Sequence, residues 1–182
     1  MKQARTLERE HYGSFYRTPS TVANLMDKAA AVLATGFAAR TCEVIAVKFE
    51  DVLKTTDRDS GEERYVVEHM RAKTTGVPVK MRALISGQLE VDILNQYIAC
   101  FPLRDRTGRF FRVLKYAADS SIVGTFKVVG KNTFSDTAKR IARLLGLDSP
   151  NLYTGHCFRR SAATMCAEMG MTLPEIMLVT GK

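Results

Sequence analysis

The stretch GHCFRRS, residues 155–161, places one histidine and two arginines at the expected start of a helix. His156 and Arg159 are three residues apart, so on a helix their side chains lie on the same face. The N-terminus of that helix adds positive potential, which favours an anion there. Both side chains can therefore contact one phosphate group. Without other signals, however, this pattern is more typical of a solvated basic turn.

Two further cationic residues lie far upstream. Arg40 belongs to the run TGFAARTCE, residues 35–43, and Lys73 opens the turn sequence KTTG. Cleavage of a phosphodiester without a metal needs fixed cations on the non-bridging oxygens, a proton donor for the leaving oxygen, and a nucleophile. Arginine suits the first task because its planar guanidinium donates two parallel hydrogen bonds and stays protonated. A lysine in a flexible turn can reach the leaving oxygen.

Each of these residues also has an ordinary structural interpretation. Arg40 can pair with Glu43 one helical turn further on, a surface contact worth well under about 1 kcal/mol. Lys73 can be a surface lysine in a hairpin turn. Arg40 and Arg159 are far apart in the sequence, so only tertiary structure can bring them to one phosphate.

The composition favours a single basic domain. The chain has 182 residues, of which 46% are hydrophobic, enough for one domain with a real core. Its formal net charge is +8, and its pI is about 9.5. Because Lys and Arg supply most of the non-specific affinity for nucleic acid, a polyanion is the expected partner.

Other protein classes find little support in the sequence. No apolar run approaches the roughly 20 residues that a membrane span needs, and residues 1–10 lack the apolar core of a signal peptide. We therefore expect a soluble intracellular protein. The cysteines and histidines lack the spacing of zinc ligands, so no metal site is predicted. Cys157 adjoins His156, but neighbours in sequence point apart on a helix, which argues against a Cys–His catalytic pair.

Hydrophobic periodicity predicts an α+β fold, a mostly helical single domain with a small three-stranded antiparallel sheet. The strand-like runs lie near residues 52–53, 65–67 and 77–81, with turn-rich sequence between them. Helices are predicted over residues 19–36, 40–47, 89–101, 133–145, 156–169 and from 172 to the last residues. The basic segment 104–131 is predicted to be mostly loop, with at most one short element. Thr133 with Asp136, and Thr172 with Glu175, have the spacing of helix-capping pairs.

Three stretches, taken together and in order, resemble the active-site motifs of tyrosine recombinases and phage-type integrases. The run at residues 35–43 resembles the first arginine box of that family, where a Gly-x-x-x-Arg-x-x-Glu-like run ends one helix and opens another. Lys73-Thr74 resembles the catalytic lysine turn of the family. Residues 156–181, HCFRRSAATMCAEMGMTLPEIMLVTG, are similar throughout to the HxxR box and the helix pair after it. The resemblance spans essentially the whole chain.

This resemblance implies a role for each motif residue. Arg40 and Arg159 would clamp the scissile phosphate, with Glu43 orienting Arg40. Lys73 would act as general acid on the leaving 5′ oxygen, and His156 would assist proton transfer from the nucleophile. In the family the nucleophile is a tyrosine that forms a 3′-phosphotyrosyl bond, and neither a metal nor a nucleotide cofactor takes part.

The sequence departs from the family pattern at its end. The His or Trp that follows the last glycine of the motif, and the tyrosine a few residues beyond, are missing from the chain, whose last residue is Lys182. We expect residues 21–182 to be a tyrosine-recombinase-like catalytic domain cut short before the nucleophile helix, with residues 1–20 as a lead-in or linker. Lys182 either occupies the His/Trp position or precedes it. The alternative is a chain that has lost the covalent step, but the presence of Lys73 and His156 favours a shortened one.

The implied function is the breaking and rejoining of duplex DNA in site-specific recombination or integration, of a mobile-element type. A homo-oligomeric synaptic complex would be the working form, in the nucleus of a eukaryote or the cytoplasm of a prokaryote. Two alternatives stay open, a type IB topoisomerase-like enzyme and a non-catalytic DNA-binding protein derived from a mobile-element recombinase. Basic residues expected to contact DNA are Arg71, Lys80, Arg82, Arg106, Arg109, Arg112, Lys115, Lys127, Lys131 and Arg160. For the basic segment 104–131, a solvated loop is the alternative interpretation.

Overall fold

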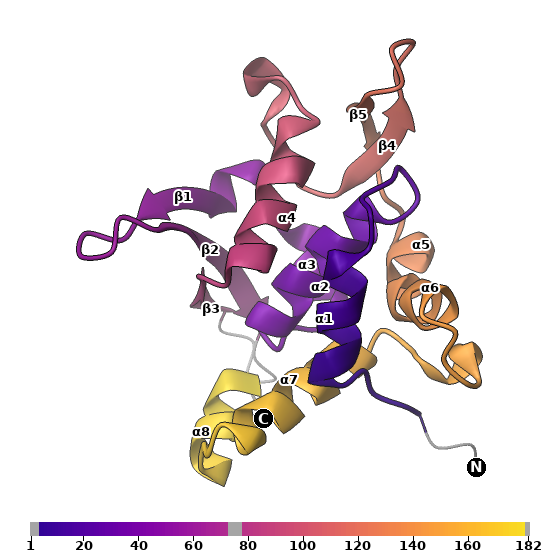
Figure 1. Cartoon of the computed structure of the whole chain (residues 1–182). Coiled ribbons are helices and arrows are strands. Elements are labelled where there is room, and N and C mark those ends of the chain that lie inside the picture. Colours follow the sequence, from indigo (N-terminus) through magenta and orange to yellow (C-terminus); the bar gives the residue numbers. More distant parts are fainter. Residues whose placement is uncertain (1–3, 73–77, 181–182) are drawn as a thin grey trace.

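Helix α2 (Leu25–Gly36) is the central helix of the computed structural model, which describes residues 4–72 and 78–180 (Figure 1). The side chains of residues 71–72, 78–79 and 178 also lie outside the described part. The fully buried alanines of α2, such as Ala29 and Ala30, let neighbouring helices approach closely. The helices around it are α1 (Arg9–Arg17), α3 (Thr41–Ala46), α4 (Gln88–Ala99), α6 (Thr137–Leu144) and α7 (Cys157–Glu168).

The start of α2 lies later than the sequence predicted. Instead of continuing from Pro19, the chain makes a turn in which the Asn24 side chain accepts a hydrogen bond from the Thr21 backbone N–H at 2.8 Å. The same side chain donates to the Pro19 carbonyl at 2.9 Å. Asn24 is one of the residue types whose side chains compete with helical backbone hydrogen bonds. The helix therefore begins at Leu25.

Residues 4–20, the described part of the predicted linker, belong to the folded domain. Residues 9–17 form α1, and Leu7, Tyr12, Phe15 and Tyr16 are buried in the main core. Helix α1 packs against α2 and α4. The prediction of a lead-in segment outside the domain is therefore wrong, because the polar residues of this stretch obscured a short amphipathic helix.

The three-stranded antiparallel sheet is confirmed, in the order β1 (Val52–Thr56), β2 (Glu63–Ala72), β3 (Pro78–Ile85). The register pairs Val52 with Val67 and Tyr65 with Ile85. The buried side chains of Tyr65, Val67 and Ile85 face the helical core, while the strands extend away from it (Figure 1). The predicted α+β fold is thus present, mostly helical with this sheet at one side.

The basic segment 104–131 is more ordered than the sequence predicted. It contains a second antiparallel pair, β4 (Arg112–Tyr116) and β5 (Ile122–Val128). This hairpin lies at the opposite end of the molecule from α7 and from α8 (Leu173–Thr180) (Figure 1). Gly124 holds it in place, because its N–H donates to the Cys100 carbonyl at 2.7 Å and a Cβ there would overlap the Phe101 ring. Tertiary contact, rather than local propensity, specifies this element.

The predicted helix over residues 133–145 is divided at Asp136. Helix α5 (Lys131–Ser135) precedes the break and α6 follows it. Thr133 lies inside α5, so the predicted capping pair with Asp136 is wrong. Gly146 ends α6 as expected, with a φ of 66° that favours glycine.

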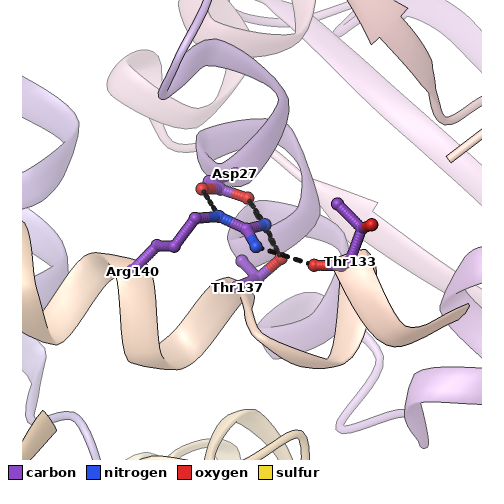
Figure 2. A network of polar contacts seen from close by, with 4 residues as sticks. All are labelled: Asp27, Thr133, Thr137 and Arg140. Carbon is purple, nitrogen blue, oxygen red and sulfur yellow. Dashed lines mark hydrogen bonds and ion pairs between the residues drawn. The ribbon is translucent and has the colours of Figure 1, made fainter. Parts of the chain in front are cut away.

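Helix α6 is tied to the central helix by a buried polar network (Figure 2). The Asp27 carboxylate accepts hydrogen bonds from Arg140 Nε at 2.7 Å and from Thr137 Oγ1 at 3.0 Å. Arg140 Nη1 also donates to the Thr133 carbonyl at 2.8 Å, which joins α5 to the same network. Asp27 is 3% exposed, so its charge is compensated inside the protein.

The last two helices begin as predicted. His156 is the residue before α7, and Gly170 follows its end with a φ of 82°. Helix α8 (Leu173–Thr180) starts with the predicted cap, in which the Glu175 carboxylate accepts from the Thr172 N–H at 2.7 Å. Short 3-10 turns complete the fold at Phe49–Asp51, Leu103–Asp105 and Pro150–Leu152. None of the helices described is both long enough and apolar enough to cross a bilayer.

Candidate phosphate-binding site

Arg40 immediately precedes α3, at the end of the turn that follows α2. Two groups of Arg40 donate to the Glu43 carboxylate, the backbone N–H at 2.8 Å and the guanidinium Nη1 at 3.0 Å. The Glu43 side chain is 6% exposed, whereas the Arg40 side chain is 40% exposed. Glu43 thus holds Arg40 from the protein side while the arginine keeps access to solvent. This contact fits the orienting role expected of Glu43.

His156 and Arg159 lie at the start of α7, the first exposed and the second half-buried. Both line a pocket of about 350 Å³ between α7 and α8, whose apolar wall includes Ile176 and Met177. The Arg159 guanidinium donates to the Thr180 carbonyl at the end of α8. Helix α8 therefore forms one wall around Arg159, and the N-terminus of α7 adds positive potential to the same place.

A contact between Thr41 and Gly155 joins the two halves of the candidate site. Thr41 Oγ1 donates to the Gly155 carbonyl at 3.3 Å. Thr41 directly follows Arg40, and Gly155 directly precedes His156, so each of these two motif residues lies one residue from the contact. Consecutive Cα atoms are only about 3.8 Å apart. The fold thus brings together the arginine box and the histidine box, which the sequence separates by more than half the chain.

The N-terminal segment holds the histidine box from another direction. The Leu7 N–H donates to Cys157 Sγ at 3.2 Å, directly after His156 in the chain. Arg160 Nη1 donates to the Ala4 carbonyl at 3.3 Å. Burial raises the pKa of the Cys157 thiol, which disfavours the nucleophilic thiolate. Cys157 is therefore a structural residue, which binds the N-terminal segment next to His156.

Two of the predicted DNA-contacting residues, Lys80 and Arg82 of β3, each form an ion pair with Glu68. Lys80 Nζ is 2.5 Å from Glu68 Oε2, and Arg82 Nη2 is 2.6 Å from Glu68 Oε1. Together they hold the pKa of the Glu68 carboxyl below its ordinary value. The cross-strand register places Glu68 here, although no acid lies near Lys80 in sequence. Lys73 lies outside the described residues, as does the side chain of Arg71.

Arg112 is withdrawn as a DNA-contacting residue because its side chain is buried. Its guanidinium donates to the carbonyls of Asp105, Thr107 and Arg109. It also lies 5.2 Å from the centre of the Phe49 ring. The donors that would contact a phosphate are thus engaged in holding the loop before β4.

The other predicted DNA-contacting residues of this segment differ in exposure. Arg106 is half-buried and its Nε donates to the Phe101 carbonyl at 2.9 Å. Arg109 is exposed, with Nη1 donating to the Ile45 carbonyl at the end of α3 at 3.0 Å. That contact puts Arg109 at the far end of the short helix that Arg40 begins. The exposed lysines of the segment are Lys115, Lys127 and Lys131.

The tyrosines of the chain are not placed as nucleophiles for this site. Burial raises the pKa of Tyr65 to about 12, and it raises the pKa of Tyr12 as well. Tyr153, the nearest to His156 in sequence, is 6% exposed. Tyr116 is exposed but belongs to the β4–β5 hairpin. The buried tyrosines are Tyr12, Tyr16, Tyr65, Tyr97 and Tyr153.

Sequence reasoning missed the residues that assemble the site. Thr41 and Gly155 each flank a motif residue, and neither carries chemistry that a motif search would select. A glycine directly before His156 is the only sequence feature that could have drawn attention to position 155. Glycines are common near helix starts for many reasons, so this feature does not indicate a close contact. Leu7 and Cys157 gave no signal, because their contact depends on the path of the N-terminal segment.

No protein-family model matches the chain, and no curated protein matches it. Solved structures do resemble it. XerH site-specific recombinase bound to difH substrate, in a pre-cleavage complex, superposes with a TM-score of 0.63 at 14% identity over 100% of this chain. The Tn1549 transposon integrase in complex with circular intermediate DNA gives 0.55 at 14% identity, also over 100%. The lambda integrase catalytic core gives 0.58 at 18% identity over 98% of the chain.

The extent of these matches defines what they show. The chain spans 48% of the XerH chain and 58% of the Tn1549 integrase chain, but 91% of the lambda integrase catalytic core. This chain therefore corresponds to nearly all of the lambda integrase catalytic core, but to only about half of the two longer chains. At these identities the likeness concerns the fold. This chain has the fold of the lambda integrase catalytic core, the catalytic-domain fold of tyrosine recombinases.

Proposed function

We propose that the chain forms the catalytic core of a DNA breaking-and-rejoining enzyme of the tyrosine recombinase type, which acts on duplex DNA in site-specific recombination or integration. The observation that carries the proposal is the Thr41–Gly155 contact, which joins the residue after Arg40 to the residue before His156. The similar structures support it, since XerH is bound to its difH substrate and the Tn1549 integrase to circular intermediate DNA.

Each residue has one task in the proposed reaction. Arg40 and Arg159 bind the non-bridging oxygens of the scissile phosphate and stabilise the added negative charge of the transition state. A tyrosine hydroxyl attacks phosphorus, and the bond from phosphorus to the 5′ oxygen breaks. His156 assists removal of the tyrosine proton, and Lys73 protonates the leaving 5′ oxygen. Rejoining reverses the step with the 5′ hydroxyl of another DNA end.

In this proposal the tyrosine comes from outside residues 1–182. The rest of the DNA is held through phosphate contacts, with Arg109 and Lys131 as candidates because both are exposed near α3 and α5. Contacts to phosphate position a protein on DNA but do not read its sequence. The lambda integrase dimer on its core site supports a working form with more than one copy of the chain.

The test is the capture of a covalent intermediate. The protein from the complete reading frame is incubated with a pool of nicked suicide duplexes that carry a randomised core. An SDS-resistant adduct at a tyrosine supports the proposal. Salt-sensitive DNA binding without any adduct would leave a non-catalytic DNA-binding protein. Relaxation of a supercoiled plasmid without strand exchange would instead indicate a type IB topoisomerase-like enzyme.

A further inference from the structure

The contact between Thr41 and Gly155 leaves no room for a larger residue at position 155. A Cβ atom added to Gly155 would lie 2.5 Å from Thr41 Oγ1, closer than the 3.0 Å that real Cβ atoms respect. It would lie at ordinary distances from the next atoms, 3.6 Å from Thr41 Cβ and 3.9 Å from the Ser135 carbonyl. Gly155 is not among the glycines with positive φ. The one overlap that a Cβ atom would make with these neighbours is therefore with the Thr41 hydroxyl.

We propose that Thr41 and Gly155 are positioning residues that set the distance between Arg40 and the His156–Arg159 pair. The inference rests on the proposed function, because it assigns the contact to the assembly of that phosphate site. One phosphate must be reached from both boxes at once, so the boxes must keep a fixed separation. A misplacement of about 1 Å in such a site can cost about 100-fold in rate. The Thr41 hydroxyl joins the boxes, and the missing Cβ of Gly155 lets them approach.

The geometry predicts an unusual pattern of rescue. Gly155→Ala should push the boxes apart, because the new methyl group meets the hydroxyl. Thr41→Ala removes that hydroxyl and should relieve the clash, so the double variant Gly155→Ala/Thr41→Ala should bind phosphate better than Gly155→Ala alone. Thr41→Val keeps the shape and removes the hydrogen bond, whereas Thr41→Ser keeps the bond.

Gly130 provides a matched control for the added methyl group. It precedes α5, as Gly155 lies just before α7, and its φ of −71° is one that alanine adopts freely. No atom lies within 4 Å of a Cβ built there. Gly130→Ala should therefore leave the site unchanged, which separates the clash from a general effect of replacing glycine.

The experiment is an NMR titration of the 182-residue chain with inorganic phosphate. The ring signal of His156 is tractable because the chain has only 3 histidines. The Nε–H signals of Arg40 and Arg159 report the two boxes. In the wild type all three signals should shift with one apparent Kd. In Gly155→Ala that Kd should rise about tenfold, which corresponds to a loss of about 1.4 kcal/mol of binding free energy. The double variant should match Thr41→Ala, and Thr41→Ser and Gly130→Ala should stay near the wild type.

The outcomes separate this inference from the proposed function. If no signal shifts in the wild type, the phosphate site itself is wrong. If the wild type responds but Gly155→Ala responds equally, the positioning role is overturned. It is also overturned if Thr41→Ala fails to improve Gly155→Ala. Should Gly155→Ala fail to fold, thermal unfolding of the double variant decides, since relief of the clash must restore a cooperative transition.

Discussion

Arg159 combines a structural contact with a proposed catalytic one. It lines the pocket between α7 and α8 and donates to the Thr180 carbonyl. A phosphate at this pocket would meet Arg159 and His156 from the same helix turn. Because Arg159 is half-buried, its guanidinium is held in place before DNA arrives, which lowers the entropy cost of a fixed geometry. Its neighbour Arg160 lines the same pocket, but its side chain is exposed and its guanidinium donates to the Ala4 carbonyl.

We predict that Arg159→Ala lowers adduct formation by about 100- to 1000-fold, the typical cost of removing one donor to a transition-state anion. DNA affinity should fall little, because one phosphate contact among many is lost. Both quantities are measured on the protein from the complete reading frame, with Arg143→Ala, an exposed arginine on α6, as the control that keeps adduct formation. Equal losses of binding and cleavage would show that Arg159 is only structural.

Arg112 shows how a basic residue in a basic segment can be structural. We predict that Arg112→Ala lowers the free energy of unfolding by about 2–4 kcal/mol, because three carbonyls lose a charged donor. Lys115→Ala, on the exposed part of the same strand, should change stability by less than about 0.5 kcal/mol. Urea unfolding measures both. A small effect of Arg112→Ala would mean that its side chain is free to contact DNA after all.

At the scale of elements, the link between α2 and α6 depends on the Asp27–Arg140 pair (Figure 2). We predict that Arg140→Ala lowers the free energy of unfolding by about 3 kcal/mol, since it leaves a buried carboxylate without its counterion. Arg143→Ala, an exposed arginine on the same helix, should cost less than about 0.5 kcal/mol. Urea unfolding of the two variants compares them directly, and equal stabilities would show that the pair contributes nothing.

The loss in Arg140→Ala should also depend on pH. Burial raises the pKa of the Asp27 carboxyl, and Arg140 opposes that effect. Without Arg140, burial acts with less opposition, so the folded carboxyl binds its proton more tightly than the unfolded one. Stability is then retained at low pH and lost as the pH rises above the ordinary value of about 4. A destabilisation that shrinks with rising pH would contradict this account.

The elements that the sequence predicted correctly are those with strong local signals. The sheet has β-branched and aromatic runs between turn residues, and the starts of α7 and α8 have polar residues before apolar periodicity. The β4–β5 hairpin had no such signal, because Gly124 against Phe101 and the buried Arg112 define it through tertiary contact. The break at Asp136 likewise had no local signal, and the helix after it is bound to another helix through Arg140 and Asp27.

The candidate site divides in the same way. Arg40, His156 and Arg159 were selected because three stretches, taken in order, resemble the motifs of tyrosine recombinases. Residue type and spacing alone were more typical of a basic turn and a surface ion pair. Thr41 and Gly155 act through their relation to each other, which no local pattern encodes. Lys73 lies outside the described residues and stays a prediction from the sequence.

At the scale of the whole molecule, the N-terminal segment is part of the domain. It buries Leu7, Tyr12, Phe15 and Tyr16, and it contacts Cys157 beside the proposed site. Burial of each such side chain contributes about 1.5–3 kcal/mol, and a domain is stable by only about 5–15 kcal/mol. We predict that deletion of residues 1–17 abolishes cooperative unfolding, as followed by circular dichroism in urea. A deletion variant as stable as the wild type would restore the linker interpretation.

Arg40 and Arg159 belong to two distant stretches that we propose to form a single phosphate site. A double-mutant cycle on covalent adduct formation shows whether they act on the same phosphate. The rates of Arg40→Ala, Arg159→Ala and the double variant are compared on one nicked suicide duplex. Residues that act on one phosphate as a unit are strongly non-additive. We predict that the double variant is within about tenfold of the slower single variant. Effects that simply multiply, each variant removing its own share of the rate, would contradict the claim.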